Sequence, residues 1–200
     1  MLNAGTVQSI VKTSINEKKS TLQCLNSIAD YCNEVVPNKK WDLIRNENAT
    51  DHALRLKPWL KEVYEYSEKS GVKGIFFALL DDPENDGLWS GKLVAMESVE
   101  YYEDDYNEWR ESAGIISKLG DANNDGLSWV GNTIGKLIEL DDLIDYALPF
   151  AFIIPAIYES SQSLCREGGV NLSRKVGVGV GYRWGDSVNL GYLDKSGFDK

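Results

Sequence analysis

One stretch of the chain, Gly74 to Met96, limits the fold more than any other. Its sequence is GIFFALLDDPENDGLWSGKLVAM, in which two apolar runs flank a polar segment that ends in Asp86-Gly87. Asp, Asn, Pro and Gly together are typical of a turn. Because successive residues of both runs are apolar, we predict a β-hairpin over 74–96 that is covered on both faces.

The residues on either side of this hairpin favour helices. In 1–72 apolar side chains recur at spacings of three and four, with Pro58 in the first turn of the last helix and Gly71 just past its end. A second helical region is predicted over 97–165. There, 97–119 is expected to be a helix with an acidic first half, and 149–158 a buried, kinked helical stretch containing two prolines.

Residues 174–193 form the second predicted hairpin. Valines at 176, 178 and 180 alternate with glycines at 177, 179 and 181, which is the period of a strand. A glycine face lets another segment approach closely. The whole chain, 1–200, is therefore expected to be a single α+β domain, with about six helices packed on a small antiparallel sheet built from two hairpins.

Charge and cysteine content exclude several classes of function. The net charge is −10, whereas binding to nucleic acid or to an anionic membrane surface needs a basic face. No apolar run is long enough to span a bilayer, and the N-terminus lacks the apolar core of a signal peptide. Three cysteines do not make a disulfide framework, so a cytoplasmic protein is expected.

No catalytic, cofactor or metal motif is complete. His52 is the only histidine, which removes multi-histidine metal centres and most nucleophilic triads. Asp121, Asn123 and Asp125 match the opening of a calcium-binding loop, but its twelfth position is Asn132 rather than the bidentate Glu. The glycines at 177–181 lead into a strand, not into a helix that could bind phosphate. We therefore expect no enzyme activity, no cofactor and no metal.

Acid interleaved with aromatic residues is the main pointer to function. Between Glu97 and Glu111 the chain has seven carboxylates and four aromatic rings, with Arg110 as the only opposing charge. On a helix, one face would hold Tyr102, Tyr106 and Trp109, and Glu97, Glu100, Asp104, Glu108 and Glu111 would lie on or near another. Two hypotheses follow: the ring face belongs to the core beneath a solvated acidic face, or the segment is a binding surface in which rings anchor and carboxylates steer a basic partner. The binding surface would then extend to a later cluster that contains Glu139, Asp141, Asp142, Asp145 and Tyr146. The binding residues would be Glu100, Tyr102, Glu103, Asp104, Asp105, Tyr106 and Glu108.

The runs EYYEDDYNEWRE (100–111) and VGVGVGYRWGDSVNLGYL (176–193), in a small acidic α+β protein, resemble bacterial immunity proteins. These are inhibitors paired with polymorphic and contact-dependent toxins. The resemblance implies tight, non-covalent occlusion of a basic toxin domain by the acidic face. Charge reversal at Asp104 and Asp105 should then weaken the complex and flatten its salt dependence.

Two other functions stay open on the sequence alone. One is a small-molecule-binding domain or enzyme with a pocket between sheet and helices, where polar groups would come from His52, Trp89 or Asp186. The other is a structural or assembly role in which 149–158 forms an interface rather than core.

Overall fold

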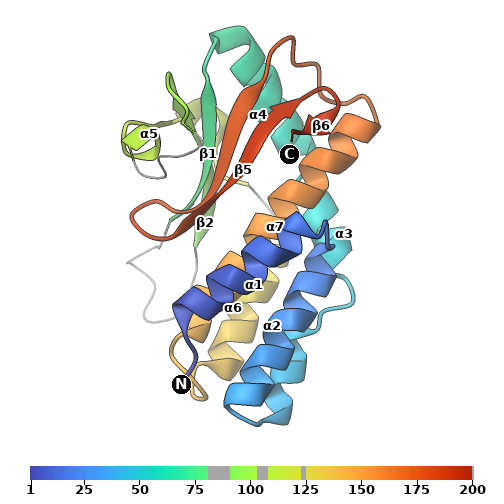
Figure 1. Ribbon diagram of the computed structural model, residues 1–200, viewed down its shortest axis with the longest axis vertical. Coiled ribbons are helices and arrows are strands. Elements are labelled where there is room, and N and C mark those ends of the chain that lie inside the picture. The colour runs from blue at the N-terminus through green and yellow to red at the C-terminus, as the bar shows by residue number, and fades with distance from the viewer. Residues whose placement is uncertain (81–90, 103–107, 123–124, 200) are drawn as a thin grey trace.

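A mixed β-sheet stands against a layer of helices, and Figure 1 shows the two side by side. The structure is a computed structural model that describes residues 1–80, 91–102, 108–122 and 125–199, with only the backbone described at Glu108 and Asp125. Within these ranges there are seven α-helices and six strands, so the chain is α+β. No helix of the described part is long and apolar enough to cross a membrane.

Four helices precede the sheet: α1 (Ala4–Asn16), α2 (Thr21–Val35), α3 (Ala49–Leu54) and α4 (Lys57–Ser70), with the 3₁₀-helix η1 (Lys39–Ile44) between α2 and α3. The ends of α2 and α4 carry residues that stabilise helix termini. Ser20 caps α2 in a reciprocal capping box with Gln23, which satisfies two backbone donors. Pro58 lies in the first turn of α4, and Gly71 ends it in the left-handed conformation at φ +82°.

The helix α7 (Ile144–Arg166) is the centre of the helical layer and contacts α1, α2, α3, α4 and α6 (Asp125–Leu137). Pro149 and Pro155 both lie inside it, and every side chain from 147 to 158 is buried. The predicted buried helical stretch is thus confirmed. These residues are core of this chain and not an exposed interface.

The sheet is larger than the small two-hairpin sheet expected from the sequence. Strands β1 (Gly74–Leu80) and β2 (Lys92–Ser98) pair antiparallel, as do β4 (Val176–Tyr182) and β5 (Ser187–Asp194). However, β1 and β4 also pair with each other in parallel, which joins the two hairpins into one sheet. Two-residue strands β3 (Gly114–Ile115) and β6 (Gly197–Phe198) complete the order β3-β2-β1-β4-β5-β6. Edges this short limit pairing with another chain.

The helix predicted over 97–119 is wrong in its described parts. β2 continues to Ser98, and later residues form only short elements: α5 (Glu108–Glu111), β3 and the 3₁₀-helix η2 (Ser117–Leu119). The reason is long-range pairing, because Glu97 lies opposite Ile75 of β1 on one side and Gly114 of β3 on the other. A residue paired with strands on both sides cannot begin a helix. The predicted turn at 81–87 lies outside the described residues.

Each face of the sheet has its own apolar cluster, as the strand alternation requires. Ile75, Phe77 and Leu79 face the helices and belong to the main core with Val176, Val178 and Val180. Phe76, Ala78, Val94 and Met96 face the other way, into a smaller cluster. In Figure 1, α5 lies on this outer side, across the sheet from the helices. Because this outer cluster is buried, another part of the chain must cover it.

Candidate functional site

The outer face of the sheet is covered by the acidic-aromatic stretch itself. We call residues 99–113 the outer segment; its described parts are 99–102 and 108–113. Tyr101 and Trp109 point inward and are only 7% and 1% exposed. They pack in the smaller apolar cluster with Phe76 and Ala113. Of the rings that helical spacing placed on the core face, Trp109 is thus confirmed as core, whereas Tyr102 is 46% exposed and Tyr106 lies outside the described residues. Tyr101, which was not expected on that face, is buried instead.

Glycines of β4 make room for both rings. A Cβ placed on Gly177 would lie 2.0 Å from Cγ of Tyr101, and one on Gly179 would lie 2.9 Å from the ring of Trp109. Real Cβ atoms essentially never come within 3.0 Å of another heavy atom. The predicted close approach to the glycine face is therefore confirmed, and the approaching segment is the outer segment.

The two rings are held from several sides. Tyr101 lies 5.0 Å from Trp109 and 4.9 Å from Tyr192 of β5 between ring centroids, and Trp109 lies 5.9 Å from Phe76 in a T-shaped pair. Such tilted and edge-to-face contacts are the favoured arrangements of aromatic pairs. Aromatic packing thus holds the outer segment on the sheet.

Arg110 ties the outer segment to the turn between β4 and β5. Its Nη1 donates to the carbonyl oxygen of Gly185 at 2.7 Å and to Oγ of Ser187 at 2.9 Å. The guanidinium also lies 5.7 Å from the ring centroid of Phe76. Burial lowers the pKa of Arg110, while the nearby charges of Glu111 and Asp186 raise it. The one cation of the acidic stretch is thus used internally.

The seven binding residues predicted from the sequence lie in different environments or outside the described residues. Glu100 is exposed and Tyr102 is 46% exposed. Glu103, Asp104, Asp105 and Tyr106 lie outside the described residues, and Glu108 begins α5 with only its backbone described. Because the described residues 97–102 form no helix, helical spacing does not place Glu97 and Glu100 on one face with the later carboxylates.

Glu97, which the helical pattern placed among the acidic residues, is half-buried in β2. One of its carboxylate oxygens accepts a hydrogen bond from the Tyr66 hydroxyl at 2.7 Å. The described residues of the outer segment that face solvent are Val99, at 74% exposure, and Glu100, Tyr102, Glu111 and Ser112. Acidic and apolar side chains are therefore exposed together on the outer segment.

A pocket of about 520 Å³ opens beside this surface, where the parallel strands β1 and β4 end against the first turns of α7. We call it the β4–β5 pocket. Its floor contains Tyr146, whose ring stacks on Phe150 at 5.5 Å and on Tyr182 at 5.4 Å. The Tyr146 hydroxyl donates to Asp186 at 2.7 Å and accepts from the side chain of Gln8 at 3.2 Å. Burial, with the bond to Asp186, raises the pKa of Tyr146.

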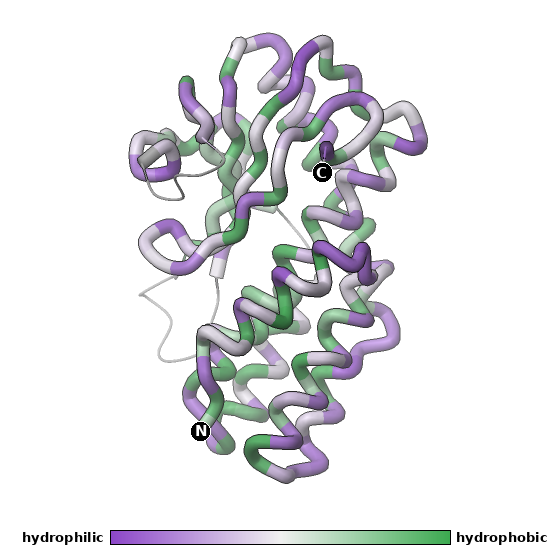
Figure 2. The backbone as a smooth tube through the Cα atoms, in the orientation of Figure 1, coloured by the Kyte–Doolittle hydropathy of each residue, from purple (hydrophilic) through white to green (hydrophobic). Residues whose placement is uncertain are grey.

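The rim of the β4–β5 pocket is the turn that joins the two strands, a hydrophilic loop at the lower left of Figure 2. Trp184 on this turn is 77% exposed, an unusual state for so large an apolar side chain. The guanidinium of Arg183 lies 4.9 Å from the Trp184 ring centroid. Tryptophan and arginine are the side chains that most often dominate binding energy at protein interfaces.

Of the three polar residues suggested for a pocket between sheet and helices, Asp186 lines the β4–β5 pocket. His52 does not line this pocket. It lies in α3, which contacts α7 near Ser160, because Oγ of Ser160 donates to the carbonyl oxygen of Ala53, the residue next to His52. Ser160 is fourteen residues beyond Tyr146 on α7, or about 20 Å along the helix. Trp89 lies outside the described residues.

The sequence indicates Tyr146 only as part of an extension of the acidic surface, with Glu139, Asp141, Asp142 and Asp145. Tyr182 is missed, because nothing local relates the two tyrosines. They are 36 residues apart, yet the Tyr182 hydroxyl donates to the Tyr146 carbonyl at 3.1 Å. Only the parallel pairing of β1 with β4 brings the end of β4 to the start of α7. The tryptophan at 184 in an otherwise polar turn was the available signal.

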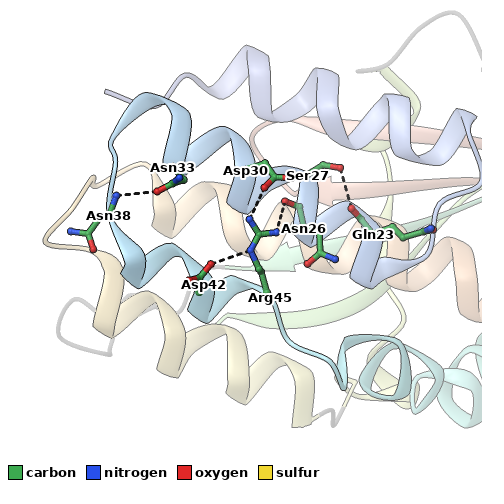
Figure 3. A network of polar contacts seen from close by, with 8 residues as sticks. All are labelled: Gln23, Asn26, Ser27, Asp30, Asn33, Asn38, Asp42 and Arg45. Carbon is green, nitrogen blue, oxygen red and sulfur yellow. Dashed lines mark hydrogen bonds and ion pairs between the residues drawn. The ribbon is translucent and has the colours of Figure 1, made fainter.

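Another polar cluster is structural. Figure 3 shows Arg45 between two carboxylates, with 2.5 Å to Asp30 and 3.2 Å to Asp42, and a bond to the Asn26 carbonyl. The side chain of Asn33 caps the backbone of Asn38 nearby. These contacts attach η1 to α2, and each of the three guanidinium nitrogens makes one of them. The cluster is therefore a brace between two elements and not a binding site.

A second cavity, of about 440 Å³, lies at the start of α2 and includes Lys18, Lys19 and Arg166. Its anion position is filled by the chain itself, because Glu159 accepts from the backbone N–H of Thr21 at 2.9 Å and from its hydroxyl at 2.7 Å. No group of three His, Cys, Asp or Glu residues in the described ranges is placed to hold a metal ion.

Comparison of the chain with protein-family models, with curated proteins and with solved structures gives no match. The functional argument therefore depends on the geometry of the outer segment and the β4–β5 pocket.

Proposed function

We propose that this chain is a non-enzymatic, acidic binding protein that neutralises a basic partner. The kind of partner that best fits is a basic toxin domain, occluded in the manner of the bacterial immunity proteins that the sequence resembles. In this proposal the protein acts in the cytoplasm, where its three buried, free thiols stay reduced.

The observation that carries the proposal is the way the outer segment is attached. Its inward side consists of Tyr101 and Trp109 on the glycine face, and its one cation, Arg110, is bonded to the β4–β5 turn. Among the described residues of the segment, the exposed side chains are Val99, Glu100, Tyr102, Glu111 and Ser112, which are mainly carboxylates and apolar groups. A rigid base under an outward acidic and apolar surface is what a preorganised interface needs.

Charge supports a basic partner in particular. The chain carries 31 acidic against 21 basic residues, and such an imbalance steers a cationic partner toward the surface from a distance. Complementary charge raises the association rate and the specificity more than it raises affinity. Affinity would come from apolar contacts with Tyr102 and Val99.

The proposal is tested by affinity capture with the tagged full chain from extract of the source cells, washed first at low and then at high salt. We expect one basic protein, retained in stoichiometric amount. The double variant Glu100→Lys/Glu111→Lys should lose it. A matched control, Glu34→Lys/Glu47→Lys, makes the same charge change at exposed positions in α2 and after η1, and should retain it. Equal capture by both variants would refute the proposed surface.

A second function, the binding of a small molecule, is favoured by one observation, which is the β4–β5 pocket itself. It lies between the sheet and α7 and contains convergent polar groups, as ligand sites usually do. If this function is right, a free small molecule should raise the thermal stability of the isolated protein, and Trp184→Ala should abolish that rise. If Trp184→Ala keeps the rise and only Glu100→Lys/Glu111→Lys loses it, small-molecule binding in the pocket is contradicted.

A further inference from the structure

The β4–β5 pocket combines two kinds of group that favour a cation. Aromatic rings of Tyr146, Tyr182 and Trp184 form part of its lining, and the carboxylates of Asp145 and Asp186 lie among them. Ring faces attract a cation through their quadrupole, most strongly for tryptophan. A carboxylate beside such rings adds a charge pair without removing the apolar wall.

The described lining has one opposing charge, on Arg183. With two carboxylates and one guanidinium, these residues carry a net charge of −1. The Arg183 guanidinium lies 4.9 Å from the ring centroid of Trp184, so this ring already has a cation beside it. With 77% of Trp184 exposed, most of the side chain is open to a further contact.

We propose that the β4–β5 pocket receives a lysine or arginine side chain of the basic partner. The ammonium or guanidinium would lie against Trp184 and pair with Asp186. The aliphatic stem would lie along Leu79 and Leu80, which line the pocket at the end of β1. This inference rests on the proposed function and names how that partner is recognised.

The pocket belongs to the same surface as the outer segment. Arg110 of the outer segment is hydrogen bonded to Gly185 and Ser187, on either side of Asp186. The charge of Asp186 is close enough to act on the Arg110 guanidinium. A partner that covers Glu111 would therefore lie next to the pocket, and one of its basic side chains could enter. This continuity favours a protein side chain over a free organic cation as the occupant.

The Tyr146 hydroxyl holds Asp186 in place for such a contact. It donates to the carboxylate at 2.7 Å, and its own ring stacks on both Phe150 and Tyr182, which also stack on each other at 6.4 Å. A carboxylate oriented by the protein loses little freedom when it pairs with an incoming cation. The variant Asp186→Asn keeps an acceptor for the hydroxyl and removes only the charge.

The first test uses the full chain with ¹⁵N-labelled tryptophan and the probe Nα-acetyl-arginine amide, followed by NMR of the indole signals. The Trp184 signal is assigned with Trp184→Phe. We expect a saturable shift of that signal, and none with the neutral isostere Nα-acetyl-citrulline amide or with Nα-acetyl-glutamate amide. Asp186→Asn should weaken binding two- to fivefold, roughly the value of an exposed charge pair. Asp51→Asn, an exposed control in α3, should have no effect.

Several results would overturn the inference. Equal binding of the citrulline probe would mean that charge is not recognised, and binding of the glutamate probe would make Arg183 the recognition group. No shift with the arginine probe up to ~50 mM would exclude a cation site of even millimolar affinity.

Capture of the basic partner by the variants separates a failure of this inference from a failure of the proposed function. If capture is lost in Glu100→Lys/Glu111→Lys but unchanged in Asp186→Asn and Trp184→Ala, the function stands and the pocket inference fails. If the arginine probe binds but no basic protein is captured, the function fails and the occupant is a free organic cation. Loss of capture in both sets of variants is the result we expect.

Discussion

Replacing Gly177 by alanine should loosen the outer segment from the sheet. The new Cβ would lie 2.0, 2.1 and 2.4 Å from three ring carbons of Tyr101. Carbon atoms in good contact are about 3.5 Å apart, so the ring would have to retreat by about 1.5 Å. It cannot do so freely, because Trp109 and Tyr192 pack against it at centroid distances of 5.0 and 4.9 Å.

The expected loss in the free energy of unfolding lies between two limits. Overpacking a well-filled core typically costs about 1–3 kcal/mol. If Tyr101 were expelled altogether, about 150–250 Å² of ring burial would be lost, or roughly 4–6 kcal/mol at 25 cal/mol per Å². We expect about 2–3 kcal/mol for Gly177→Ala, because the neighbouring rings can yield in part.

Equilibrium unfolding in urea measures this loss. Gly114→Ala is the matched control, since a Cβ on this strand glycine meets nothing within 4 Å and its φ is not positive. The double variant Gly177→Ala/Tyr101→Ala should be less destabilised than the sum of the two single variants, because the clash needs the ring. A neutral Gly177→Ala, or strict additivity, would show that Tyr101 does not lie on Gly177.

Three further predictions concern stability. Burial raises the pKa of the Cys24 thiol from 9.0 to about 11 and that of Cys32 to about 12. The folded state therefore keeps protons that the unfolded state loses above pH 9, and the unfolding free energy should fall by about 1 kcal/mol per thiol between pH 8 and pH 10. The double variant with alanine at both positions should lose the share of these two thiols and keep that of Cys165, whose pKa burial also raises to about 11. Tyr64→Phe should lower the free energy of unfolding by about 1–3 kcal/mol in thermal unfolding, because the Tyr64 hydroxyl is hydrogen bonded to Oγ of Ser161 at 2.6 Å in the core. Adding Ser161→Ala should recover part of this loss. An unchanged stability of Tyr64→Phe would contradict the hydrogen bond. Trp184→Ala should change the free energy of unfolding in urea by no more than about 0.5 kcal/mol, since the side chain is mostly exposed. A larger change would assign Trp184 a role in folding rather than in binding.

Local signals made much of the fold predictable. Pro58 and Gly71 mark the ends of α4 because their backbone preferences act within one turn. The valine–glycine alternation from 176 to 181 indicates a strand with one glycine face, and that face is where the outer segment packs. Such features depend on neighbours in the sequence, so a single chain is enough to read them.

The errors came from interactions between distant residues. Glu97 and the residues after it have helical spacing, but the edge of β1 takes up their backbone hydrogen bonds as far as Ser98. The parallel pairing of Gly74 with Gly177 joins strands about a hundred residues apart, and no local pattern indicates it. The β4–β5 pocket depends on that pairing, which is why the sequence suggests Asp186 and Tyr146 separately, one for a pocket and one for the acidic surface, but does not bring them together.

The most direct test of the proposed function is the salt dependence of the complex with the captured basic partner. Calorimetric titration of the full chain should give a dissociation constant that rises steeply with salt. Glu100→Lys/Glu111→Lys should weaken binding at low salt by about tenfold and flatten the salt dependence, since each exposed charge pair is worth up to about 1 kcal/mol. If both variant and wild type bind equally well and independently of salt, the acidic surface is not the binding site, and the proposed function is wrong.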